Sequence, residues 1–225
     1  NSAAALLAAG AALALAAGVT LAVHAQPKGP SAKAAACAGG DTGITLPPGF
    51  CATVFADNLG ATRHIAVPAD GTVYANTWNG SSYFPRTPVA PDGFLIALQD
   101  TDKDGKADKV THFGVTPAEG SKGGTGVGLY KNYLYAEMND KIVRYRLTAG
   151  VAVPTAKPEV VLSGMPLGGD HPMHPFVFDA KGQMFVDMGT ATNSCQPKNR
   201  VAGIPGNQPC AELNTRGGTW LYSAD

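Results

Sequence analysis

The chain has 225 residues, which is enough for one domain with a hydrophobic core. Its 17 basic and 17 acidic residues give a formal net charge of zero, and no basic block stands out, so the sequence gives little support for binding to nucleic acid or to a charged membrane surface. The 28 Gly and 17 Pro residues are typical of a chain rich in turns and favour many short strands.

The N-terminal segment contains an uncharged run rich in Ala and Leu at residues 3–23. One interpretation is a signal peptide, because a cleavage site with small residues ends at Ala25. The other is a membrane anchor, because the run is long enough to span a bilayer. We assign residues 1–25 to this segment and residues 26–40 to a flexible linker. Both interpretations predict a periplasmic or secreted protein, which meets a membrane only if the segment stays uncleaved.

Four cysteines, Cys37, Cys51, Cys195 and Cys210, fall into two local pairs. No CxxC motif or Cys/His zinc spacing occurs, and an exported protein meets an oxidising compartment. We therefore predict the disulfides Cys37–Cys51 and Cys195–Cys210. Other connectivities are possible, but the local one closes short loops, and a loop of about 15 residues contributes roughly 3 kcal/mol in the chain-entropy model. The alternative is that the cysteines are buried free thiols.

A hairpin pattern recurs three times, at residues 65–76, 127–137 and 176–187. A further apolar strand follows each hairpin, at 93–99, 141–147 and 218–222, and the first two copies add a fourth strand at 109–113 and 159–162. Four antiparallel strands that recur every 50 to 60 residues or so are typical of β-propeller blades. We predict an all-β fold, with residues 41–225 forming about three blades of a propeller.

Two features predict that the chain is a piece of a longer protein. It begins with Asn1 rather than Met and ends directly after an apolar run at 219–222. Blades bury their faces only against neighbouring blades, so three blades cannot close a ring. We expect this piece to be inactive by itself.

An acidic segment between two predicted strands has the spacing of a calcium-binding loop. Asp100, Asp102, Asp104 and Asp108 occupy positions 1, 3, 5 and 9 of an EF-hand-like loop, and a Gly occupies position 6. Position 12 is a Thr instead of the bidentate Glu, which weakens the match. We predict a structural calcium site here; the alternative is a solvated turn in which the Asp side chains bond to the backbone.

The stretch at residues 170–195 places two histidines before an apolar, alternating segment that ends in a polar loop. Such side chains at the ends of buried strands are typical of a binding or catalytic site. We expect His174 to be a packing or supporting group, because the flanking prolines exclude a helix that would present two metal ligands on one face. Asn193, near the loop tip, either lines the site or forms an Asx-type turn.

These motifs, in this order, resemble the glucose/sorbosone dehydrogenase family over residues 41–225. The resemblance rests on Ile-Thr-Leu-Pro-Pro-Gly-Phe at 44–50, on Pro-Ala-Asp-Gly at 68–71, on the acidic loop at 100–108 and on Gly-Asp-His-Pro-Met-His at 169–174. It implies an exported, six-bladed propeller that uses pyrroloquinoline quinone (PQQ) with calcium. The implied substrate is a sugar or sugar aldehyde, and the implied electron acceptor is a cytochrome or quinone.

The resemblance also implies a role for His171, which matches the family's catalytic histidine. As a general base it would take the hydroxyl proton of the substrate while hydride moves to the quinone. We expect His171 and Asn193 to contact the cofactor. Glucose-oxidising members have Gly-Asp where this chain has Gly189-Thr190, and that Asp orients the histidine. Asp187, on the same strand face as Gly189, is the candidate to replace it.

A second hypothesis is a non-catalytic propeller that binds a ligand or partner, because propellers host both kinds of function. Thr190 favours this hypothesis, whereas His171 and the neighbouring cysteines favour the enzyme. A third option, a lactonase-like metal-dependent hydrolase, needs a converging set of Glu, Asn and Asp ligands that the sequence does not show.

Overall fold

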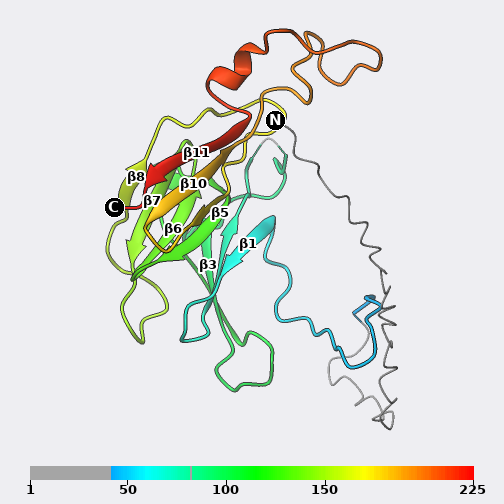
Figure 1. Cartoon of the computed structure of the whole chain (residues 1–225). Helices are drawn as coiled ribbons and strands as arrows, with labels where there is room; N and C mark the ends of the chain where they lie inside the picture. The colour runs from blue at the N-terminus through cyan, green and yellow to red at the C-terminus, as the bar shows by residue number, and fades with distance from the viewer. Residues whose placement is uncertain (1–41, 82) are drawn as a thin grey trace, which may run out of the picture.

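The computed structural model describes residues 42–81 and 83–225 and shows an all-β chain, as predicted (Figure 1). Within these ranges, two short 3-10 helices, η1 at Pro117–Glu119 and η2 at Ala211–Asn214, accompany the strands. None of the helices in the described ranges has the length and apolar character needed to cross a membrane. The predicted export segment, the linker and Cys37 lie outside the described residues.

The strands form three antiparallel sheets, which we call blades 1, 2 and 3. Blade 1 has the order β1-β2-β3-β4, with β1 at Thr62–Ala66, β2 at Val73–Thr77, β3 at Leu95–Gln99 and β4 at Lys109–Phe113. Blade 2 has the order β5-β6-β7-β8, with β5 at Gly123–Tyr130, β6 at Tyr133–Met138, β7 at Lys141–Arg146 and β8 at Glu159–Leu162. Blade 3 has the order β11-β10-β9, with β9 at Phe176–Phe178, β10 at Gln183–Met188 and β11 at Gly218–Ser223. Each predicted hairpin and each following strand is present.

The hairpins of blades 1 and 3 share the same turn chemistry. The Asp70 carboxylate accepts a hydrogen bond from the backbone N–H two residues later at 3.0 Å, and Asp179 does the same at 2.9 Å. Gly71 and Gly182 then take left-handed conformations, with φ of 84° and 83°. Asp70 directly precedes its Gly, whereas Asp179 lies three residues before its Gly. The left-handed Gly is therefore the feature that both turns share, and together with a nearby Asp it makes the repeat visible in the sequence.

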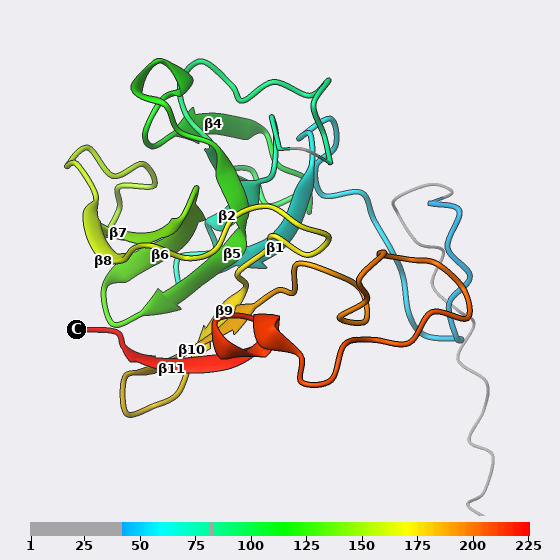
Figure 2. The ribbon, with the colours of Figure 1, turned by 90° about the horizontal axis from the view of Figure 1, so that it is seen from above.

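The blades are arranged around their first strands. β5 contacts both β1 and β9, and the later strands of each blade lead away from this centre (Figure 2). This arrangement is consistent with a β-propeller-like fold, although the three blades form no closed ring within the described residues. It brings residues that are far apart in the sequence to one central face.

The hydrophobic core lies between neighbouring blades, so the middle blade is buried on both faces. On β6, Leu134 and Ala136 pack against blade 1, whereas Tyr135 between them packs against blade 3. This division follows from the alternation of side chains along a strand. Blade 3 packs so closely against β5 that a Cβ atom at Gly126 would lie 2.7 Å from the Phe176 ring. The Gly-rich sequence of β5 therefore permits the blades to pack.

Candidate functional site

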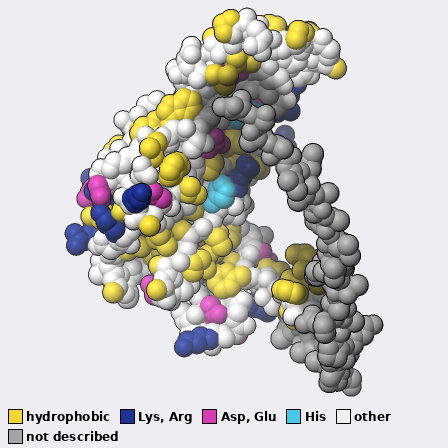
Figure 3. All heavy atoms as spheres, viewed as in Figure 1, with side chains coloured by type: hydrophobic (Ala, Val, Ile, Leu, Met, Phe, Trp, Pro, Cys, Tyr) yellow, Lys and Arg dark blue, Asp and Glu magenta, His cyan; other side chains and the backbone are white. Residues whose placement is uncertain are grey.

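Two adjoining cavities lie where the first strands of the three blades meet. The first, which we call the His171 cavity, has a volume of about 330 Å³, and its lining includes Arg63, His171 and Asp187. The second, the His64 cavity, has a volume of about 420 Å³ and mostly apolar walls. Both cavities include Asp187 and Pro175 in their lining, so they adjoin. Hydrophobic side chains and a histidine gather on the face of the molecule seen in Figure 3.

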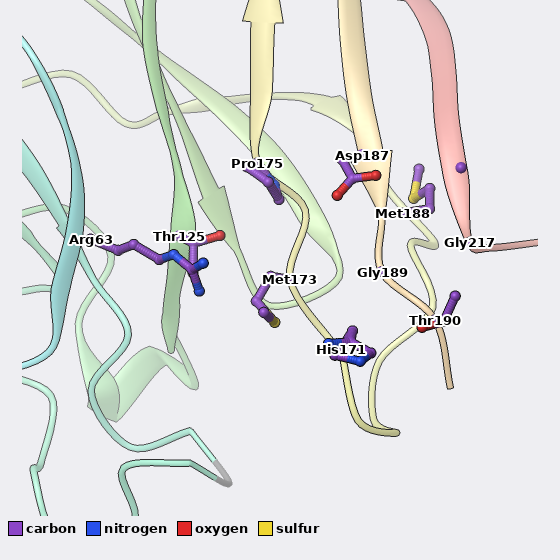
Figure 4. Close-up of a pocket in the computed structure, with 11 residues that line it drawn as sticks. Arg63, Thr125, His171, Met173, Pro175, Asp187, Met188, Gly189, Thr190 and Gly217 are labelled. Carbon is purple, nitrogen blue, oxygen red and sulfur yellow. The ribbon is translucent and has the colours of Figure 1, made fainter. Parts of the chain in front are cut away.

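Figure 4 shows how three blades supply the His171 cavity. Arg63 enters from β1, Thr125 comes from β5, and His171 lies on the segment that leads into β9. Asp187 projects from β10 on the opposite side. The predicted catalytic histidine therefore faces a cavity, as a histidine in contact with a substrate must.

The His171 backbone is held against the end of β10. Its N–H donates to the Thr190 carbonyl at 3.0 Å, and the Gly189 N–H donates to the backbone carbonyl of Met173 at 3.2 Å. Gly189 is required at this point because a Cβ atom there would collide with the His171 carbonyl oxygen and lie 2.8 Å from the carbonyl carbon. The segment thus extends the pairing of β9 with β10 and carries His171 to the mouth of the cavity.

No hydrogen bond between described residues joins the His171 imidazole to the Asp187 carboxylate or to the Thr190 hydroxyl. Asp187 lines the cavity and lies on the expected strand, but the expected orienting contact to His171 is absent from this structure. The role of His171 as a base stays a prediction.

Arg216 is a functional candidate that the sequence analysis missed. Its side chain is buried, and its guanidinium donates to the carbonyls of Gly189 at 2.6 Å, Gly168 at 3.0 Å and His171 at 3.3 Å. Burial lowers the pKa of Arg216 and outweighs the opposite effect of the nearby Glu212 carboxylate. A buried cation bound to three carbonyls positions the segment that carries His171. A single Arg after a disulfide loop has no pattern that would reveal this role.

His174 is fully buried, as expected of a supporting residue. Its Nδ1 lies 3.0 Å from a Glu137 carboxylate oxygen and its Nε2 lies 3.1 Å from the Pro166 carbonyl. The backbone N–H of His174 also donates to the same Glu137 oxygen, at 3.0 Å. The other Glu137 oxygen accepts the N–H groups of Thr125 at 2.7 Å and Gly126 at 2.9 Å. Glu137 therefore ties β5 to the segment before β9.

The loop after β10 carries the predicted disulfide Cys195–Cys210, which the structure confirms with a Cα–Cα distance of 5.9 Å. Asn193 is exposed, its backbone N–H donates to Asn199 at 2.9 Å, and it lines neither cavity. Its role in cofactor binding stays a prediction without support from this position. The predicted pair of Cys51 involves Cys37, which is not described.

The acidic loop brings together three of its four predicted ligands. One carboxylate oxygen from each of Asp100, Asp102 and Asp108 lies within 4.8 Å of the others, and Asp104 does not join them. Asp104 instead accepts the N–H of Lys106 at 2.8 Å, and Asp108 accepts the N–H of Thr101 at 2.9 Å. These bonds to the backbone show that the Asp side chains stabilise the turn itself. Calcium binding stays a prediction.

Comparisons with known proteins find likeness of fold to several solved structures. No protein-family model and no curated protein matches the sequence. The calcium structure of the Trichoderma reesei Carbohydrate-Active Enzymes Family AA12 protein has a TM-score of 0.54 and 12% identity, covering 76% of this chain and 37% of that chain. Its iodide structure has a TM-score of 0.53 with the same identity and coverage. The holo form of the PQQ domain of pyranose dehydrogenase from Coprinopsis cinerea has a TM-score of 0.53 and 12% identity, covering 76% of this chain and 35% of that chain.

This chain thus spans little more than a third of the length of these solved structures. At 12% identity the likeness concerns the arrangement of the backbone, and it covers 76% of this chain. The resemblance expected from the sequence is therefore confirmed at the level of the fold, which this chain shares with the family AA12 protein and with the PQQ domain of pyranose dehydrogenase.

Proposed function

We propose that the protein, in its full length, is an exported PQQ-dependent dehydrogenase of a sugar or sugar aldehyde, with His171 as general base. The observation that carries this proposal is the position of His171 in a cavity at the centre of a fold shared with a PQQ domain. A neutral imidazole at the mouth of a cavity has the chemistry needed to take a hydroxyl proton near neutral pH.

The cavity offers groups that suit PQQ, which is a planar quinone with three carboxylates. Arg63 points into the cavity (Figure 4), and none of the ion pairs within the described ranges involves it. Its guanidinium would bind a cofactor carboxylate by a charge-assisted hydrogen bond. Pro175 and Met173 add apolar surface for a ring system. Bound PQQ would supply the hydride acceptor, and the electrons would pass on to a cytochrome or quinone.

The residues of this chain would contribute binding, orientation and proton transfer. The O–H bond of the substrate would break with its proton moving to His171, while the C–H bond would break with both electrons leaving as hydride. Arg216 would hold the His171 backbone through its bonds to the His171 and Gly189 carbonyls. The acidic loop at 100–108 would bind calcium in a structural role, remote from these steps.

The test uses the full-length protein reconstituted with PQQ and Ca²⁺ and measures dye reduction with a panel of aldoses and sugar aldehydes. We expect activity, and we expect quinone absorbance to remain after desalting. His171→Ala should abolish activity and leave thermal stability nearly unchanged, and His112→Ala, on β4 of blade 1, is the matched control. Absence of both activity and retained quinone absorbance would overturn the enzyme proposal.

The second candidate function is a non-catalytic propeller that binds a ligand or partner. The absence of a hydrogen bond from Asp187 or Thr190 to the His171 imidazole favours it, because a catalytic histidine is usually oriented by a third group. If quinone is not retained while a sugar still binds to the protein, this second candidate is supported.

A further inference from the structure

We propose that His64 is a second ligand-binding histidine, whose Nε2 accepts a hydrogen bond from a hydroxyl group of a neutral, polyhydroxylated ligand. That the ligand is a sugar rests on the proposed function. The state and position of the imidazole rest on the structure alone.

The first step is the tautomer of His64. Its Nδ1 lies 2.6 Å from the backbone carbonyl oxygen of Thr125. A carbonyl oxygen can only accept a hydrogen bond, so Nδ1 must carry the proton. In the neutral ring, Nε2 is then left with a free lone pair, which makes it a hydrogen-bond acceptor. The contact with Thr125 therefore decides which nitrogen is available to a ligand.

The second step is the rigidity of that contact. Thr125 is fully buried, and its N–H and hydroxyl both donate to the Glu137 carboxylate, at 2.7 and 3.2 Å. The next carbonyl along β5, that of Gly126, accepts from the buried Asn76 side chain at 2.7 Å. The acceptor for His64 is thus held by buried groups from blades 1 and 2. The His171 imidazole has no equivalent support from Asp187 or Thr190.

The third step is the direction in which His64 points. Neighbouring residues of a regular strand face opposite sides, but the register of β1 against β2 shifts between Thr62 and Ile65. Within this irregularity, Arg63 lines the His171 cavity and His64 lines the adjoining His64 cavity. β-Bulges often re-aim side chains next to active sites. The bulge here places two consecutive polar residues on the same central face.

The fourth step is the chemistry of the His64 cavity. The Nε2 lone pair of His64 and the Asp187 carboxylate are both acceptors, and the remaining walls are mostly apolar. Among the described residues, no Lys or Arg lines this cavity beside the two acceptors. The cavity therefore favours a ligand that carries several O–H donors, and the Asp187 carboxylate repels an anionic ligand. The cation Arg63 lies in the neighbouring cavity, so the two cavities differ in the charge that they suit. A neutral polyol fits the His64 cavity better than a sugar acid does.

The experiment uses the full-length protein with ¹⁵N-labelled histidine at a pH above neutral. His64→Asn assigns the His64 signal and still offers a side-chain N–H to Thr125, but it lacks the Nε2 lone pair. Long-range ¹H–¹⁵N spectra should show His64 with a protonated Nδ1 and an unprotonated Nε2. D-Glucose should shift the Nε2 signal, whereas D-gluconate at equal concentration should not. His64→Asn should weaken D-glucose binding about tenfold, as expected for the loss of one such hydrogen bond.

His112→Asn is the matched control and should leave D-glucose binding unchanged. A His64 signal with Nε2 protonated and Nδ1 free would overturn the inference, whatever the enzyme activity. So would equal binding of D-glucose by the His64→Asn variant and the unchanged protein. D-Glucose binding that depends on His64 in a protein without dehydrogenase activity would support this inference while overturning the proposed function. Full dehydrogenase activity with an unaltered KM for D-glucose in His64→Asn would overturn this inference and leave the proposed function intact.

Discussion

Gly189 is the residue at which β10 comes closest to the backbone of His171. A Cβ atom there would meet backbone atoms, which cannot move aside as a flexible side chain can. We expect Gly189→Ala to lower the free energy of unfolding by about 1–3 kcal/mol, the usual cost of overpacking. Gly218→Ala, whose Cβ would meet only the Trp220 ring at 3.3 Å, is the matched control for chemical unfolding. Equal stability of the two variants would contradict this account.

Arg216 shows at the same scale how a side chain outside the cavity can organise it. Arg216→Met keeps the volume but removes the donors to three backbone carbonyls. Buried acceptors without a donor cost about 1–3 kcal/mol, so we expect a loss of stability in this range by urea unfolding. Arg146→Met, at an exposed position on β7, should change stability by far less. Faster amide exchange at His171 and Gly189 in Arg216→Met would locate the effect.

Among the elements, the loop after β10 depends on covalent and polar contacts instead of a core. The disulfide Cys195–Cys210 closes a loop with a sequence separation of 15. In the chain-entropy model, the double variant Cys195→Ser, Cys210→Ser should lose about 3 kcal/mol of stability, measured by denaturant unfolding under oxidising conditions. A loss below 1 kcal/mol or so would mean that residual structure in the unfolded chain already restrains this loop.

Glu212 holds the other end of this loop and makes it sensitive to acid. Burial raises the pKa of Glu212, but hydrogen bonds from Thr192 and Ala191 outweigh it, so the net pKa is lowered. A carboxyl whose pKa is lower in the folded state stabilises the protein above its unfolded pKa. That stabilisation is lost as the pH falls through the folded pKa.

Acid should therefore release this loop before the core unfolds. We expect amide exchange of Ala191 and Thr192 to rise below the unfolded pKa of a glutamate, and Glu212→Gln to abolish this pH dependence. Asp170 also has a lowered pKa, because Asn199 and Arg200 donate hydrogen bonds to it. Asp170→Asn therefore measures how much Asp170 contributes to the rise in amide exchange at low pH. If Glu212→Gln retains the full acid response, the contacts of Asp170 are responsible.

At the scale of the whole molecule, the blades are joined by a buried polar network as well as by apolar packing. Glu137 on β6 bonds to Thr125 and Gly126 on β5 and to His174 before β9. Glu137→Ala would leave the buried N–H groups of Thr125 and Gly126 without their acceptor, and each such group typically costs about 1–3 kcal/mol, so we expect a loss of stability of at least this size.

The controls distinguish this network from ordinary surface charge. Glu159→Ala removes an exposed ion pair with Arg144 and should cost at most about 1 kcal/mol. A double-mutant cycle of Glu137→Gln with His174→Gln measures the coupling between the two side chains and applies even if Glu137→Ala does not fold. Additive effects in this cycle would show that the two residues act independently.

Much of the fold could be predicted from the sequence because the information is local. The hairpins are encoded by alternating strands and by turns in which Asp precedes Gly, as at Asp70 and Asp179. The disulfide Cys195–Cys210 follows from the spacing of two cysteines in an export context. His171 lies on the segment that leads into a predicted strand, and its position in the cavity follows from the pairing of that segment with the end of β10.

The rest of the site was decided by contacts between blades. The bulge of β1 turns Arg63 and His64 to the centre, and the carbonyl of Thr125, 61 residues from His64, decides which imidazole nitrogen is free. Arg216 lies 45 residues from His171, whose carbonyl it binds. The sequence alone determined the strands, their turns and the repeat, since these depend on neighbouring residues. Only the tertiary structure decided which side chains share a cavity, because packing between distant strands sets their distance and direction.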